Sequence, residues 1–450
     1  MIRFFGKTSF APLLLLLHVL LGGFGWAQEG ELAIQVLETE KTLRLDGLWP
    51  GFAPLDVAVA LFDGEKTVLA RHPNPPEEFS PMPGHDGFYF CKGRHPQVVA
   101  NSTAMIGDRR TATVLLNMNS DPSLEALAGI VVHESFHVFQ WLGHDDWMAN
   151  EAVTFTYPVE DVQGLVYRRL EAQALNKALG STSDELALAW AKGAMEMREK
   201  RFSRLSEDQR AYDRSLERLE GSAFFLEDQC QGKKPSRLAE EMEANDIRKR
   251  NYATGQALCF LLDRFHPQWK ERLEKGPKAD LDVMLKEVLD KNEIKPCMPD
   301  PALVSEMERK AKDDVEKVIA ARNEEKQAFM EAQGWTLVIQ VRNPENLFWP
   351  SGFDPMNVIR LNEHEILHTR MLQLSGQAGS FDAMNLKTLT LAKGPHPLYN
   401  GVTRITVTGM AEEPEINEVE GKVTVTAKDL KVTLTGAKIE KSKNMVSLYI

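Results

Sequence analysis

Two histidines and a glutamate stand close together in the segment His133-Glu134-Ser135-Phe136-His137. Residues four apart share one face of a helix, so both imidazoles of this His-Glu-x-x-His pattern can bind one metal ion. Glu134 would lie beside that ion, where it can act as general base toward a metal-activated water. Apolar residues at 130–132 and 138–139 indicate that the helix is buried. Because buried polar side chains are costly without a role, we interpret the segment as a metal site.

A catalytic zinc site has three protein ligands and one open position. Two glutamates downstream of the histidines can supply the third ligand. Glu151 stands in Asn150-Glu151-Ala152, and Glu220 opens the segment Glu220-Gly221-Ser222-Ala223-Phe224-Phe225. Either glutamate can instead orient a histidine from outside the ligand set.

These segments resemble the gluzincin metallopeptidases, the superfamily that includes thermolysin and the zinc aminopeptidases. Glu220-Gly221-x-Ala223-x-Phe225 is similar to the Glu-Gly-x-Ala-x-Tyr signature of that superfamily, with phenylalanine in place of tyrosine. Asn150-Glu151-Ala152 is similar to the thermolysin-type Asn-Glu-Ala, and Tyr252-x-x-Gly255 resembles the start of the helix that follows the glutamate helix. The resemblance covers about residues 111–290, and its specific part is His-Glu-x-x-His.

The resemblance implies a mainly helical zincin-like catalytic domain that binds one zinc ion (Zn2+) per chain. The order of its elements favours His133, His137 and Glu220 as ligands, with Glu151 as the alternative third ligand. It implies a metallopeptidase, so the expected substrate is a peptide or protein.

The reaction also needs a donor to the negative charge that develops on the substrate oxygen. The phenols of Tyr252 and Tyr157 are candidates, and we assign this catalytic role to Tyr252. A second His-Glu-x-x-His match, His364 to His368, lies in a strand-rich region. Residues four apart on a strand are separated by about 13 Å, which does not suit one ion, so we interpret it as a chance match.

The predicted fold class is α+β. Residues 28–120 form a β-rich segment, with strands at 32–37, 57–62 and 111–116, that includes the edge strand of the catalytic domain. Residues 121–300 form the helical catalytic domain, and 301–334 form a charged helical connector. Residues 335–450 alternate with period two and predict an antiparallel β module. The predicted helices after the motif are 162–178, 185–204, 209–226, 253–265 and 281–289.

The N-terminus has the pattern of a signal peptide, residues 1–27. A positively charged start precedes an apolar stretch at 10–21, and Gly25-Trp26-Ala27 offers a cleavage site. We therefore expect an extracytoplasmic protein, periplasmic or secreted, without stable membrane insertion after cleavage near Ala27. The net charge of −12 and the pI of about 5.5 exclude nucleic acid as an expected partner. Nothing in the sequence indicates the oligomeric state.

An oxidising compartment permits disulfides, and Cys230 and Cys297 are the pair that we expect among the 4 cysteines. The alternative function is a non-catalytic binding protein that retains a zincin scaffold. Its binding surface would then be the C-terminal β module, with contacts from Trp335, Phe348 and Trp349.

Overall fold

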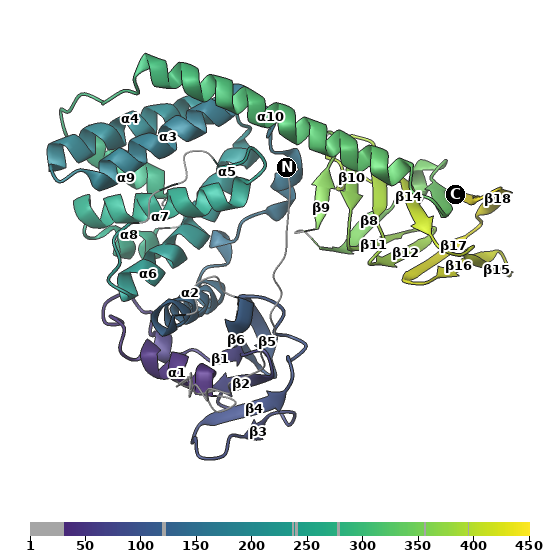
Figure 1. The fold of residues 1–450 in the computed structure, drawn as a ribbon, viewed down its shortest axis with the longest axis horizontal. Coiled ribbons are helices and arrows are strands. Elements are labelled where there is room, and N and C mark those ends of the chain that lie inside the picture. The colour runs from purple at the N-terminus through teal and green to yellow at the C-terminus, as the bar shows by residue number, and fades with distance from the viewer. Residues whose placement is uncertain are drawn as a thin grey trace, which may run out of the picture.

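The structure is a computed structural model that describes residues 31–118, 123–235, 238, 242–276, 280–354, 357–394 and 396–450. These residues form an α+β protein, as predicted, with helices in the middle of the chain and antiparallel-rich sheets at its C-terminal end (Figure 1). The predicted signal peptide, residues 1–27, lies outside the described residues.

The N-terminal part is a six-stranded sheet in the order β3-β4-β2-β1-β6-β5. Its strands are β1 (Val59–Phe62), β2 (Lys66–Ala70), β3 (Ser80–Pro81), β4 (Phe88–Lys92), β5 (Ser102–Ile106) and β6 (Arg109–Leu115), with short 3₁₀ turns η1 (Pro54–Asp56) and η2 (Leu116–Met118). Only β1 and β6 pair in parallel. Within the part of the chain that the structure describes, strand β5 pairs only with β6, so it is a sheet edge, and it lies against helix α2 (Leu124–Gly143).

The predicted strand at residues 32–37 is wrong, because this segment is helix α1 (Glu31–Glu40). Ala33, Val36 and Leu37 follow the helical spacing i, i+3 and i+4, and all three are buried. They share an apolar cluster with the first turns of α2. The short apolar run fits both periods, and packing against α2 selects the helix.

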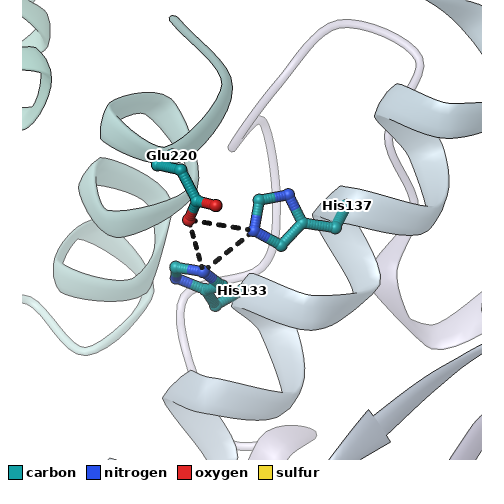
Figure 2. Close-up of side chains that lie close together, drawn as sticks. All are labelled: His133, His137 and Glu220. Carbon is teal, nitrogen blue, oxygen red and sulfur yellow. Dashed lines mark hydrogen bonds and ion pairs between the residues drawn. The ribbon is translucent and has the colours of Figure 1, made fainter. Parts of the chain in front are cut away.

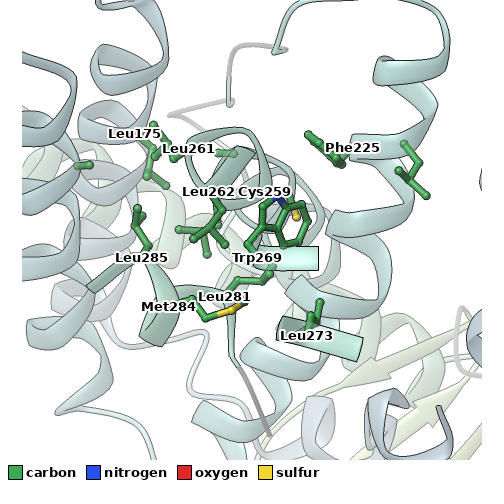
Figure 3. Packing of buried hydrophobic residues seen from close by; sticks show 14 of the residues in the cluster. Leu175, Phe225, Cys259, Leu261, Leu262, Trp269, Leu273, Leu281, Met284 and Leu285 are labelled. Carbon is green, nitrogen blue, oxygen red and sulfur yellow. The ribbon is translucent and has the colours of Figure 1, made fainter. Parts of the chain in front are cut away.

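The helical body follows α2, and the helices predicted there are confirmed. They are α3 (Val162–Gly180), α4 (Asp184–Phe202), α5 (Glu207–Leu216), α6 (Ser222–Cys230), α7 (Ile247–Phe265), α8 (Trp269–Lys275) and α9 (Leu281–Asp290), with 3₁₀ turns η3 (Asp145–Trp147) and η4 (Glu151–Thr156) and the π-helical turn η5 (Glu217–Gly221). The core of this body gathers around the fully buried Trp269 (Figure 3). Figure 3 shows Cys259 and Leu262 of α7 next to this indole.

The charged helix α10 (Pro301–Met330) joins the helical body to the C-terminal module (Figure 1). Near its start, Met307, Ala311 and Val315 form a buried stripe that packs with residues of α3. At its far end, Phe329 is buried with Leu367 and Leu389 of the module. The helix therefore has an apolar contact near each end and mostly exposed charged residues between them.

The C-terminal module contains two sheets around one apolar core. The first has the order β18-β19-β7-β14-β13-β10-β9, and the second has the order β15-β16-β17-β12-β11-β8. All strand pairs are antiparallel except β19 with β7. The strands are β7 (Trp335–Gln340), β8 (Trp349–Phe353), β9 (Val358–Arg360), β10 (Glu365–His368), β11 (Met371–Gly376), β12 (Gly379–Met384), β13 (Thr388–Ala392), β14 (Val402–Met410), β15 (Glu415–Val419), β16 (Lys422–Ala427), β17 (Leu430–Thr435), β18 (Lys438–Ser442) and β19 (Met445–Tyr449), with the 3₁₀ turn η6 (Pro344–Asn346).

Candidate metal centre

Helix α2 presents the two histidines of the motif on one face. Its N-terminus is capped by the Ser123 hydroxyl, which accepts a hydrogen bond of 3.3 Å from Ala126 N. The spacing of four residues brings His133 Nε2 within 3.1 Å of His137 Nε2. Both imidazoles therefore turn the same ring nitrogen toward one point.

Glu220 comes from the π-helical turn η5 and faces both histidines. Its Oε2 lies 3.5 Å from His137 Nε2 and 3.9 Å from His133 Nε2. Figure 2 shows the three side chains pointing toward one another from two different helices. Within the described residues, they are the group of three whose ligand atoms lie close enough together, within 4.8 Å, to hold one metal ion.

Two residues that the sequence analysis did not predict as part of the site bind the Nδ1 atoms of the two histidines. Glu227 Oε2 lies 3.1 Å from His133 Nδ1, and Gln140 Oε1 lies 2.7 Å from His137 Nδ1. Both partner oxygens can only accept, so each Nδ1 carries a proton, and each Nε2 is the ring nitrogen left to bind a metal ion. Such outer partners are the usual means of orienting metal-binding histidines. The available signal was positional: Gln140 stands three residues after His137, and Glu227 stands seven after Glu220.

A close contact between two glycines sets the position of η5. A Cβ atom on Gly221 would lie 2.4 Å from Gly255 Cα, and one on Gly255 would lie 2.3 Å from the Glu217 carbonyl oxygen. Only glycines permit this approach, because the opposing atoms belong to the backbone and cannot move aside. The Glu-Gly and Tyr-x-x-Gly segments thus meet where η5 crosses α7. That crossing places Glu220 opposite α2.

No protein-family model, no curated protein and no solved structure matches this chain. The resemblance to gluzincins therefore stays a prediction, and the function has to be argued from the site itself. None of the helices in the described part of the chain combines the length and the apolar character that a membrane span requires.

Glu134 is buried beside the two histidines, and its Oε2 makes no hydrogen bond with a described residue. Burial raises the pKa of this carboxyl, and the neighbouring His133 and His137 lower it to a smaller extent. An unpaired buried carboxylate costs stability, so its retention needs a reason. A proton-accepting role in a reaction supplies one.

The alternative third ligand, Glu151, lies elsewhere. It begins η4, where its carboxylate pairs with Arg248 and accepts a hydrogen bond of 3.1 Å from the Tyr212 hydroxyl. It does not belong to the group of converging ligand atoms. The structure thus brings Glu220, rather than Glu151, to the histidines.

The two tyrosines considered as donors to the substrate oxygen lie in different environments. Tyr252, on α7, packs on Phe224 with ring centroids 5.7 Å apart, and Phe224 in turn packs on His133 at 4.6 Å. Tyr157 is buried and donates its hydroxyl to Asp213 at 2.9 Å, so that proton is already committed. Phe225 is also buried, against Phe260 and Trp269, and belongs to the core rather than to the site.

The second His-Glu-x-x-His match adopts a different structure. His364 is exposed in the turn before β10, and His368 lies buried within that strand, 3.3 Å from the Thr390 hydroxyl. Neither belongs to a cluster of possible metal ligands among the described residues.

The expected Cys230–Cys297 disulfide is wrong, because all four cysteines have free thiols. Cys230 ends α6, and its thiol donates to the Glu227 carbonyl at 3.1 Å. Cys297 lies against α4, where its backbone N–H donates to Ala189 O at 2.9 Å. The two residues pack on different helices, which the loop-like sequence around each did not reveal.

Zinc binding is expected to release a proton and to strengthen as the pH rises. In the metal-free protein, burial lowers the pKa of His137, but the Glu220 carboxylate outweighs burial and raises it from 6.5 to about 9. Burial raises the pKa of Glu220, and His137 then lowers it to about 2. At neutral pH the two groups therefore form an ion pair, and a metal ion must displace the His137 proton.

The apparent zinc affinity should rise about tenfold per pH unit from pH 7 and level off near the pKa of His137. The stabilisation that the ion pair gives the metal-free protein has the opposite pH dependence. It is fully present below pH 6.5 and is lost as the pH rises through about 9. Calorimetric titration with zinc in buffers of different ionisation enthalpy counts the released protons. A pH-independent affinity over this range would contradict the prediction.

Proposed function

We propose that the protein is an exported zinc-dependent metallohydrolase, and that it is a peptidase. The observation that carries the proposal is the convergence of two imidazole Nε2 atoms and one carboxylate oxygen beside the buried Glu134, whose Oε2 has no hydrogen-bond partner among the described residues. Two imidazoles and one carboxylate are a ligand set of catalytic zinc sites, whereas magnesium and calcium prefer oxygen ligands alone. Export is inferred from the pattern of residues 1–27.

The residues fit a zinc ion, since both Nδ1 atoms are already bound to other groups and both Nε2 atoms face the shared point, where zinc would displace the proton of His137. A zinc ion at this position would supply a Lewis acid and would lower the pKa of a coordinated water to about 7. Glu134 accepts the proton of the attacking water and later delivers it to the leaving amine. The Tyr252 hydroxyl donates to the oxygen that becomes negatively charged.

The sheet edge beside α2 favours a peptide as the substrate. Among the described residues, one side of strand β5 pairs with no other strand, and β5 lies against the helix that carries both histidines. An extended peptide can add to such an edge through main-chain hydrogen bonds, which do not depend on its side chains. We infer that a substrate strand lies along β5 with its scissile bond next to α2.

Metal analysis of residues 28–450 tests this proposal. We expect one zinc per chain in the parent and none in His133→Ala. The matched control is His364→Ala, because His364 is a histidine of the second match and is exposed outside the site. It should keep both the zinc and the activity. A folded parent that binds no zinc would refute the proposed function.

Turnover separates the peptidase from the alternative, a binding protein that retains the scaffold. The parent should hydrolyse casein or members of a peptide library, and His133→Ala should not. Zinc binding without hydrolysis of either would favour the alternative. This alternative proposes contacts to a partner in the C-terminal module. Of these residues, Phe348 is fully buried and cannot contact a partner, whereas Trp349 on β8 is 47% exposed.

A further inference from the structure

Arg248, in the first turn of α7, contacts three groups around the candidate metal centre. Its Nε donates to the Tyr252 hydroxyl oxygen at 2.9 Å, and one terminal nitrogen pairs with Glu151. The other terminal nitrogen lies 3.5 Å from Glu220 Oε1. The guanidinium thus touches a proposed metal ligand and the proposed oxyanion donor at once.

The hydrogen-bonding chemistry of Arg248 determines how the side chains of Tyr252 and Glu220 are oriented. A guanidinium can only donate, so the oxygen of Tyr252 accepts from Arg248 and its O–H remains free for another acceptor. In the same way, Arg248 engages Oε1 of Glu220 and leaves Oε2 facing the histidines. Without Arg248, the phenol could donate to Glu220 or to Glu151 and would no longer be directed at a substrate.

We propose that Arg248 is a positioning residue for the reaction: it holds the Tyr252 hydroxyl as a donor and directs Glu220 Oε2 toward the metal. This inference rests on the proposed function. It also explains Glu151, which is not a ligand but fixes Arg248. Tyr212 donates to the same Glu151 carboxylate and so completes the arrangement.

The C-terminal module contacts η4, the turn that carries Glu151. Glu151 belongs to η4, and the next residue, Ala152, accepts a hydrogen bond of 3.0 Å at its carbonyl from His396 Nε2 of the module. Phe155 of η4 is buried in the module's apolar core, with its ring 5.6 Å from that of Phe353. The module therefore fixes η4, whose Glu151 pairs with Arg248. In this way the module is part of the framework of the site.

Kinetics of a double-mutant cycle test the proposal. The proteins are the parent, Arg248→Gln, Tyr252→Phe and the double variant, each loaded with saturating zinc and given a library peptide that the parent cleaves. Outer positioning residues contribute roughly 10–100-fold, so Arg248→Gln should lower kcat by that factor with little change in KM. In the Tyr252→Phe background the same substitution should cost less, because one of the two groups that Arg248 positions is gone and only its effect on Glu220 remains. Losses that simply multiply would overturn the proposal, as would full activity of Arg248→Gln.

Further variants separate positioning from folding. Lys249→Gln is the matched control, because it removes a positive charge from the neighbouring, exposed position and should have no effect. Arg248→Lys should recover part of kcat, since a lysine can donate but cannot reach all three partners. Glu151→Gln should reproduce the loss of kcat even if Arg248→Gln fails to fold, and full activity of Glu151→Gln would count against the proposal. A parent without zinc or turnover would show instead that the proposed function fails, and the inference would fall with it.

Discussion

Replacing Glu134 with glutamine is expected to lower kcat by about 10²- to 10⁴-fold while zinc remains bound. The amide keeps the size of the side chain but cannot accept a proton from water. Glu134 is not among the three converging ligands, so the metal content should equal that of the parent. Zinc analysis and peptide turnover on the same samples measure both effects.

The same substitution should not lower the melting temperature of the metal-free protein. Glu134 is buried, its Oε2 has no hydrogen-bond partner among the described residues, and burial raises its pKa. A neutral amide at this position avoids the cost of a buried charge, and a gain in stability with a loss of activity is typical of active-site groups.

Glu125→Gln is the matched control, since Glu125 lies exposed in the first turn of the same helix. It should change neither turnover nor zinc content. If Glu134→Gln retained the activity of the parent, Glu134 would not be the general base.

Replacing Arg198 with methionine is expected to destabilise the protein by about 3–5 kcal/mol, because it breaks a buried ion network. Arg198, in α4, is only 2% exposed. It donates to Glu171 at 2.8 Å, to Asp282 at 3.1 Å and to both oxygens of Glu217. Methionine fills the space but leaves Glu217 buried without its cation.

The loss should extend to the metal centre, because Glu217 begins the π-helical turn that carries Glu220. Zinc affinity should therefore fall together with the midpoint of chemical unfolding of the metal-free protein. A second substitution, Glu217→Gln, should recover part of the stability of Arg198→Met by removing the unpaired charge.

Arg204→Met provides the control for Arg198→Met. Arg204 pairs with Asp161 at the surface, where its side chain is 41% exposed, and such pairs contribute about 0–1 kcal/mol. Equal destabilisation by Arg198→Met and Arg204→Met would show that the buried network does not hold the helical body together.

Local spacing alone was sufficient for part of this picture. The separation of four residues between His133 and His137 places both imidazoles on one helix face whatever surrounds the helix, because the helical period requires it. The period-two alternation after residue 334 likewise specifies strands with one buried face. The α+β class follows from these two periodicities, and the structure confirms it.

Only the tertiary structure decided which distant side chains join the histidines. Glu151 and Glu220 are equivalent as residue types, and the contact between Gly221 and Gly255 brings the second one to α2. Glu227 reaches His133 from α6, and Arg248 reaches Glu220 from α7, and no single segment encodes such contacts between distant residues. The apolar run at 32–37 fits a strand or a helix, and burial against α2 makes it a helix. Sequence spacing determines which neighbours share a face, whereas packing between residues far apart in the chain determines what that face meets.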